Sequence, residues 1–217
     1  MQRCSKVLLP AAVLMLCAFI PAEAAAQAEL SPFIGYLIGS DINPTRVTDT
    51  AVLPISRSFD SSLTWGLRGA YFFEDANNLG IEGTFSQSPL TGFSIGPTSL
   101  DARATYVDLN IVVQSTGPSA RFYGTVGMGL TRFRMGASEG GQTHTKLGIN
   151  YGVGVKVPMW TNPAGRWGMR FDIRDQWLRM DADSSMRSNF RDALLLPPNS
   201  ASSIHNIVTT LAFYFQF

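Results

Sequence analysis

Apolar and polar residues alternate along most of this 217-residue chain. The pattern is clearest over residues 204–217, where Phe213, Phe215 and Phe217 occupy odd positions and Gln216 occupies an even one. Successive side chains of a β-strand point to opposite faces, whereas a helix repeats about every 3.6 residues. The segment is therefore predicted to be a strand with one apolar face and one partly polar face.

Eight segments of the chain show this alternation. Glycines interrupt nearly every one of them, and a glycine inside a helix costs about 1 kcal/mol, so strands are favoured over helices. The predicted strands cover residues 29–39, 62–73, 78–87, 102–115, 119–134, 144–157, 166–180 and 204–217. Most are longer than the usual strand of about 5 to 6 residues, and they suit tilted strands that cross a bilayer.

The connections between the predicted strands alternate between long and short. The long connections are residues 40–61, 88–101, 135–143 and 181–203, and the short ones are residues 74–77, 116–118 and 158–165. The short connections contain the turn-forming residues Asn, Asp, Gly and Pro. Long loops on one side and short turns on the other are typical of outer-membrane barrels. The predicted fold is therefore all-β, an eight-stranded antiparallel up-and-down transmembrane β-barrel with both chain ends in the periplasm.

The composition supports a membrane protein that crosses with strands. Charged residues make up 15% of the chain, against about 25% in a typical soluble domain. After the N-terminal segment, no stretch approaches the ~20 consecutive apolar residues that a transmembrane helix needs. A secreted β-sandwich or a soluble lipocalin-like barrel shares part of this composition and stays open as the alternative fold.

The first 26 residues are predicted to be a cleaved signal peptide. Arg3 and Lys6 form a basic start, residues 7–20 form an apolar core, and small alanines precede a cleavage site after Ala26. The apolar core is too short to span a membrane, so export followed by removal is expected.

Residues 27–217 form the predicted barrel domain. Both cysteines, Cys4 and Cys17, lie in the signal peptide, so the mature chain is expected to rely on its backbone hydrogen bonds and not on disulfides. The formal net charge of the whole chain is +1. Because a nearly neutral chain gives no electrostatic attraction to nucleic acid, no nucleic-acid partner is expected.

Charged residues gather on one face of the predicted strands, and that face is predicted to line the lumen. Near the middle of a bilayer, a basic residue facing lipid costs about 2–4 kcal/mol. An eight-stranded barrel has an interior just wide enough for side chains to fill it. We therefore predict a plugged polar lumen in which acidic and basic side chains pair. The predicted lumen charge network consists of Arg68, Glu82, Asp108, Lys156, Arg170, Asp172 and Arg174.

Aromatic residues mark the ends of the opposite, lipid-facing side. On two strands they recur with a spacing of roughly 20–25 Å along the membrane normal, close to the ~25 Å height of the apolar band of a barrel. Aromatic girdles stand at both edges of such a band. The predicted girdle residues are Trp65, Tyr71, Phe73, Trp167 and Trp177.

The chain resembles the small eight-stranded bacterial outer-membrane β-barrels, the type seen in the outer-membrane protein A transmembrane domain and in outer-membrane proteins X and W. The residues that carry the resemblance are the signal peptide, the glycine-rich segments 123–130 and 151–155, and the odd-position aromatics that end at Phe217. The resemblance implies a Gram-negative outer-membrane location among outer-membrane lipids. It also implies a C-terminal signal, Phe213, Phe215 and Phe217, that the barrel-assembly machinery reads after periplasmic chaperones deliver the chain. Because the sequence ends at Phe217, we expect no peptidoglycan-binding domain of the outer-membrane protein A type.

The sequence favours a non-catalytic structural or surface protein that displays four extracellular loops and needs no cofactor. The histidines, His144 and His205, supply no metal cluster. Two other functions stay open: passage or binding of small hydrophobic molecules, as in the outer-membrane protein W type, and adhesion through the loops to a partner that the sequence does not identify.

A lipid A-modifying enzyme is a further alternative. Ser203 and His205 share the lipid-facing side of their strand, with Asp175 or Asp181 on the strand beside it. The order Ser-x-His departs from the His-x-Ser of the lipid A deacylase barrels, and the expected Glu is missing. Residues 183–196 are predicted to form a short helix in the fourth long loop that folds over the barrel mouth or contacts lipid or a partner.

Overall fold

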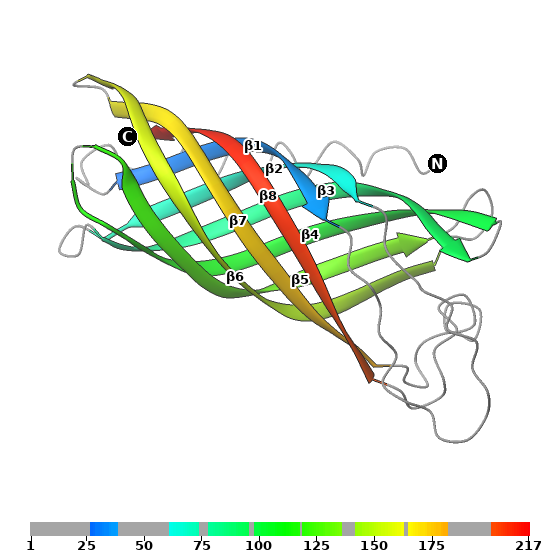
Figure 1. Ribbon diagram of the computed structural model, residues 1–217. Helices are drawn as coiled ribbons and strands as arrows, with labels where there is room; N and C mark the ends of the chain where they lie inside the picture. The colour runs from blue at the N-terminus through cyan, green and yellow to red at the C-terminus, as the bar shows by residue number, and fades with distance from the viewer. Residues whose placement is uncertain are drawn as a thin grey trace, which may run out of the picture.

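The computed structural model contains one closed barrel of eight antiparallel strands (Figure 1). The structure describes residues 27–38, 61–73, 78–95, 98–117, 119–135, 142–162, 165–181 and 201–217. The strands are β1 (Gln27–Ile38), β2 (Ser62–Phe72), β3 (Leu79–Ile95), β4 (Thr98–Gln114), β5 (Arg121–Met135), β6 (Gln142–Asn162), β7 (Gly165–Asp181) and β8 (Ala201–Gln216). This confirms the predicted fold class.

The barrel closes because β1 pairs with both β2 and β8. Each strand thereby has two antiparallel neighbours, and no strand is left as an open edge along the barrel wall. Closure matters in hydrocarbon, where an unpaired backbone group costs several kcal/mol. We call the end of the barrel where β1 begins and β8 finishes the terminus end, and the opposite end the loop end.

The two faces of the wall are the reverse of those in a soluble protein. Outward-facing apolar residues are exposed, as in Leu63 at 60% and Leu109 at 62%, while Arg170 and Glu82 are fully buried inside. Fully buried charges are rare in soluble domains, and contiguous exposed apolar surface of this extent is rarer still. The distribution fits a bilayer outside and a polar lumen inside, and it is contrary to the alternative of a soluble sandwich or lipocalin-like barrel.

The hairpin of β3 and β4 is longer than the sequence indicated. Residues 88–101 were predicted to be a long loop, but the pairing continues to Ile95↔Thr98 with one irregularity between Thr91 and Phe93. Pro89 lies in this segment, and proline cannot donate a backbone hydrogen bond to a strand ladder. The ladder between β2 and β3 ends at Gln87, so Pro89 lies where β3 has a neighbour on one side, and there its missing donor costs little.

The predicted turn at residues 158–165 is also largely strand. β6 continues to Asn162 and pairs with β7 beyond an irregularity at Pro158. The cause is the same, because β5 and β6 stop pairing at Lys156 and leave that side of β6 free. The predicted alternation of long and short connections was therefore wrong between β3 and β4. The connection between β6 and β7 is short as predicted but begins later, and the strand order and count were right.

Two predicted segments, the signal peptide at 1–26 and the loop helix at 183–196, lie outside the described residues. In the part of the chain that the structure does describe, no helix has the length and apolarity to cross a membrane.

Candidate functional site: the charged lumen

The lumen contains all seven charged residues that the sequence placed on inward positions. Each is buried, with an exposed fraction of 8% or less. They are Arg68 on β2, Glu82 on β3, Asp108 on β4, Lys156 on β6, and Arg170, Asp172 and Arg174 on β7. Two residues that the sequence interpretation missed join them, Glu29 of β1 and Tyr123 of β5, and both are buried.

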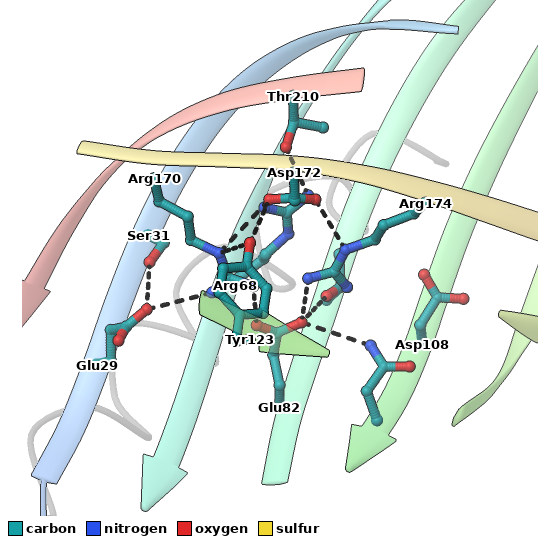
Figure 2. A network of polar contacts seen from close by, with 12 residues as sticks. Glu29, Ser31, Arg68, Glu82, Asp108, Tyr123, Arg170, Asp172, Arg174 and Thr210 are labelled. Carbon is teal, nitrogen blue, oxygen red and sulfur yellow. Dashed lines mark hydrogen bonds and ion pairs between the residues drawn. The ribbon is translucent and has the colours of Figure 1, made fainter. Parts of the chain in front are cut away.

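Arg170 lies at the centre of this cluster and contacts three other strands (Figure 2). Its Nη1 lies 3.2 Å from Glu29 Oε1, and its Nη2 lies 2.7 Å from Glu82 Oε2. Its Nε donates a hydrogen bond of 2.7 Å to the Tyr123 hydroxyl. The contact with Glu82 is an ion pair without hydrogen-bond alignment, so charge attraction holds it. One side chain thus connects β7 to β1, β3 and β5.

Asp172 binds the other two arginines of the cluster. Its Oδ2 accepts hydrogen bonds from Arg68 Nη1 at 2.6 Å and from the Tyr123 hydroxyl at 2.9 Å. Its Oδ1 accepts a hydrogen bond of 2.9 Å from Arg174 Nε. Arg174 Nη2 also lies 2.7 Å from Glu82 Oε1, so the two carboxylates and the three guanidinium groups form one connected network.

The remaining strands join through Lys156 and Arg68. Lys156 Nζ donates to Glu29 Oε2 at 2.6 Å and to Gln114 Oε1 of β4 at 3.2 Å. Arg68 Nη2 donates to Thr210 Oγ1 of β8 at 3.1 Å. Every strand of the barrel therefore contributes at least one side chain to these contacts. We call the cluster the charged layer, defined as Glu29, Arg68, Glu82, Tyr123, Lys156, Arg170, Asp172 and Arg174.

The charges of the lumen compensate one another. The buried charged residues of the described strands comprise four bases and four acids, once Asp108 is counted with the charged layer. Balance is required, because removing one partner of a buried pair leaves an uncompensated charge. Aromatic rings also stabilise two of the cations. Arg68 Cζ lies 4.0 Å from the ring centroid of Phe33, and Lys156 Nζ lies 4.5 Å from that of Phe72.

Inward-facing glycines make room for these long side chains. A Cβ added at Gly152 of β6 would meet the side chain of Arg174, and a Cβ at Gly154 would meet the hydroxyl and ring of Tyr123. The glycines therefore act here through their small volume. Because core space is filled closely, even one methyl group at such a position forces neighbours to shift.

A second group of lumen residues is polar and uncharged. It lies on β4 to β7 and carries polar side-chain atoms without a hydrogen-bond partner in the described part of the chain. We call it the neutral wall, defined as Tyr106, Asn110, Thr125, Asn150 and Gln176. Asp108 lies beside it, and its hydrogen bond within the described structure is a single 3.3 Å contact from Gln176 Nε2.

Glu29 and Tyr123 escaped prediction for different reasons. Glu29 is the first residue of the predicted strand at 29–39, so only the residues that follow it indicate its face. Tyr123 lies among glycines in a segment whose inward face has few charged side chains. The signal that could have found both is strand parity, because Glu29 shares the inward parity of Ser31, and Tyr123 that of Thr125.

The outer surface contains the predicted girdle and terminal aromatics. All eight are exposed: Trp65, Tyr71, Phe73, Trp167, Trp177, Phe213, Phe215 and Phe217. Trp65 and Trp177 lie toward the loop end of their strands, and the others lie toward the terminus end. Their roles at the lipid interface and in assembly stay predictions.

Three outward-facing polar residues contact one another on β6, β7 and β8. Asp175 Oδ2 accepts a 2.6 Å hydrogen bond from the Tyr151 hydroxyl and lies 2.8 Å from His205 Nδ1. Ser203, the nucleophile in the enzyme alternative, is exposed and makes no hydrogen bond with His205. The geometry thus contains a carboxylate–imidazole pair without a nucleophile bound to it. Among the described residues, no group of three His, Cys, Asp or Glu side chains could hold a metal ion.

Comparison with known proteins places this architecture among small membrane barrels. No curated protein sequence matches the chain. Several solved structures are similar, among them three that are each matched over 88% of this chain. Neisserial surface protein A has a TM-score of 0.56 at 10% identity over 99% of its length. The outer membrane protein OprG of Pseudomonas aeruginosa has a TM-score of 0.53 at 15% identity over 95%. The N-terminal β-barrel domain of OprF from the same organism has a TM-score of 0.51 at 12% identity over 97%.

At these identities the similarities show the fold. The family is shown by the sequence itself, because a model of the outer membrane protein beta-barrel domain matches residues 11–191, most of the chain. This chain therefore belongs to the outer membrane protein β-barrel domain family.

Proposed function

We propose that this protein is a non-catalytic structural barrel with a closed lumen, whose loop end faces the cell exterior and whose terminus end faces the periplasm. The observation that carries the proposal is the charged layer, whose residues come from six strands and which is joined to the other two by hydrogen bonds to Gln114 of β4 and Thr210 of β8. Side chains that are paired across the lumen hold the wall together, and they also occupy the path that an ion or a solute would take.

The character of the lumen also bears on the two open alternatives. A conduit for small hydrophobic molecules needs an apolar interior, whereas the layer that crosses this lumen is made of ion pairs. An enzyme needs a nucleophile or an activated water beside its base, and Ser203 makes no such contact. Both observations support a role in which the barrel is a stable framework for its loops.

Conductance in planar bilayers tests whether the lumen is closed. We expect no unitary current steps from the refolded wild-type protein, with a general porin inserted as the positive control. The double variant Arg170→Ala/Glu82→Ala removes two side chains at the centre of the layer and is expected to give small steps. Stable steps from the wild type would contradict the proposal.

The absence of cysteine from residues 27–217 allows a clean test of orientation. Thr143 and Thr161 are exposed residues near opposite ends of β6. We expect Thr143→Cys to react with a membrane-impermeant maleimide on intact cells and Thr161→Cys to react only after the outer membrane is disrupted. The reverse pattern would overturn the proposed orientation.

A further inference from the structure

In the described part of the structure, few outward-facing strand residues are charged. Among outward-facing strand residues whose side chains the structure describes, four carry a formal charge: Arg103, Arg132, Arg134 and Asp175. Asp175 has partners in Tyr151 and His205. The three arginines have no hydrogen bond or ion pair within the described structure, and all three are exposed. They lie on the adjacent strands β4 and β5, toward the loop end.

The register brings the three guanidinium groups together. Arg103 of β4 is the cross-strand partner of Arg134 of β5, and Arg132 lies on the same face of β5. Residues directly opposite in an antiparallel pair have Cβ atoms about 4.5–5.5 Å apart, and like charges there repel. A surface that holds three positive charges so close, with no acidic side chain between them among the described residues, is suited to an anion.

The residues next to the three arginines along β4 and β5 indicate how deep the arginines lie in the membrane. The next outward residue of β5 is Leu130, which is 50% exposed, and β4 continues through Thr105 to Val107, which is 53% exposed. From there the outer faces of both strands are apolar toward the terminus end, apart from a glycine. The arginines therefore border the apolar band, at the level where lipid headgroups begin.

We propose that Arg103, Arg132 and Arg134 form a binding surface for phosphate-bearing lipid headgroups of the leaflet at the loop end. Guanidinium groups bind phosphate through two parallel hydrogen bonds, which an ammonium group cannot do. A basic side chain near an anionic lipid surface contributes attraction equivalent to about a fivefold preference. The position of the patch at the edge of the apolar band favours a lipid, which is held there by its chains, over a soluble anion.

Spin-labelled lipids test this directly in the refolded, full-length barrel. In phosphatidylcholine vesicles, electron paramagnetic resonance gives the association of labelled phosphatidic acid relative to labelled phosphatidylcholine at the protein surface. We expect wild type to prefer phosphatidic acid by about fivefold or more at low salt, with the preference falling as salt screens the charges.

Three sets of variants make the result specific. R103Q/R132Q/R134Q is expected to bind the two lipids equally, and R103K/R132K/R134K is expected to keep a reduced preference. The control T143Q/T145Q changes two exposed residues on the neighbouring strand β6 without altering charge, and it should behave as wild type. The single variants R132Q and R134Q should each lose part of the preference, so they decide the matter if the triple variant does not refold.

Two outcomes would overturn the proposal. One is an undiminished preference in the glutamine variants, with folding verified by the shift between cold and boiled electrophoresis bands. The other is full displacement of the labelled phosphatidic acid by millimolar inorganic phosphate at constant ionic strength, which would show a site for the free anion and not for the lipid.

Discussion

The charged layer and the neutral wall occupy the same lumen, yet they differ in how their polar groups are matched. In the charged layer every ionised side chain has an oppositely charged partner, as Arg170 has in Glu29 and Glu82. In the neutral wall, both amide atoms of Asn150 and the hydroxyl of Thr125 lack a partner within the described structure.

The difference follows from what each kind of group costs when it is buried. An uncompensated ion costs several kcal/mol, which favours the close pairing of opposite charges in the charged layer. A neutral amide or hydroxyl without a protein partner costs about 1–3 kcal/mol, which a stable barrel can tolerate. We therefore expect stability to depend strongly on the charged layer and weakly on the neutral wall.

The largest effect is expected from Arg170→Met. This change leaves Glu29 and Glu82 with fewer positive partners and removes the donor to Tyr123. Breaking a buried ion pair from one side costs about 3–5 kcal/mol. The measurement is urea unfolding of the refolded barrel in lipid vesicles, with Tyr106→Phe as the control, because it removes a buried hydroxyl that has no hydrogen-bond partner in the described structure. If Arg170→Met lowered the free energy of unfolding by less than about 1 kcal/mol, stability would not depend more on the charged layer than on the neutral wall.

The coupling between Glu29 and Lys156 tests whether the ion pairs of the charged layer act as units. Each single change, Glu29→Gln or Lys156→Met, leaves the other residue of the pair charged and without this partner. The double variant removes both members of the 2.6 Å pair. Glu29→Gln should cost more than Lys156→Met, because Glu29 also contacts Arg170. A double-mutant cycle should give a coupling free energy of about 0.5–3 kcal/mol. Strict additivity of the two losses would show that the pair does not act as a unit.

A smaller loss of stability is expected when the space around the charged layer is filled. Gly152→Ala places a methyl group against the backbone carbonyl of Ile173 and the side chain of Arg174, whereas Gly69→Ala on the outer face of β2 meets nothing within 4 Å. Overpacking of a filled interior typically costs about 1–3 kcal/mol. We expect a loss of that size for Gly152→Ala and none for Gly69→Ala in the same unfolding assay. Equal stability of the two variants would mean that the layer can rearrange freely.

The sequence predicted the faces of the strands better than their ends or their contacts. Alternation is imposed by the pleat, so the side of the wall on which Arg68 or Asp172 lies follows from neighbouring residues. Which acid meets which base depends on the stagger of strands around the barrel, a property of the whole wall. The contact between Glu29 and Arg170 joins residues 141 positions apart, and no local pattern encodes it.

The ends of β3 and β6 were predicted too early, at segments that contain a proline. Pro89 and Pro158 lie in these segments, and proline cannot donate a backbone hydrogen bond to a strand ladder. Each lies just past the point where one neighbouring strand stops pairing, so its missing donor is not needed there. The extent of a strand beyond its neighbour is set by the tilt and stagger of the closed barrel, which the sequence of one strand does not contain.

The smallest effect is expected from Thr125→Val in the neutral wall. The substitution keeps the shape of the side chain and removes a buried hydroxyl that has no partner in the described structure. No protein group loses a hydrogen bond, and removing an unmatched polar group can be nearly neutral or stabilising. The free energy of unfolding should therefore change by less than about 0.5 kcal/mol in the assay used for Arg170→Met. A loss above about 2 kcal/mol would show that the hydroxyl is matched as firmly as the ions, and the distinction between the two regions of the lumen would fail.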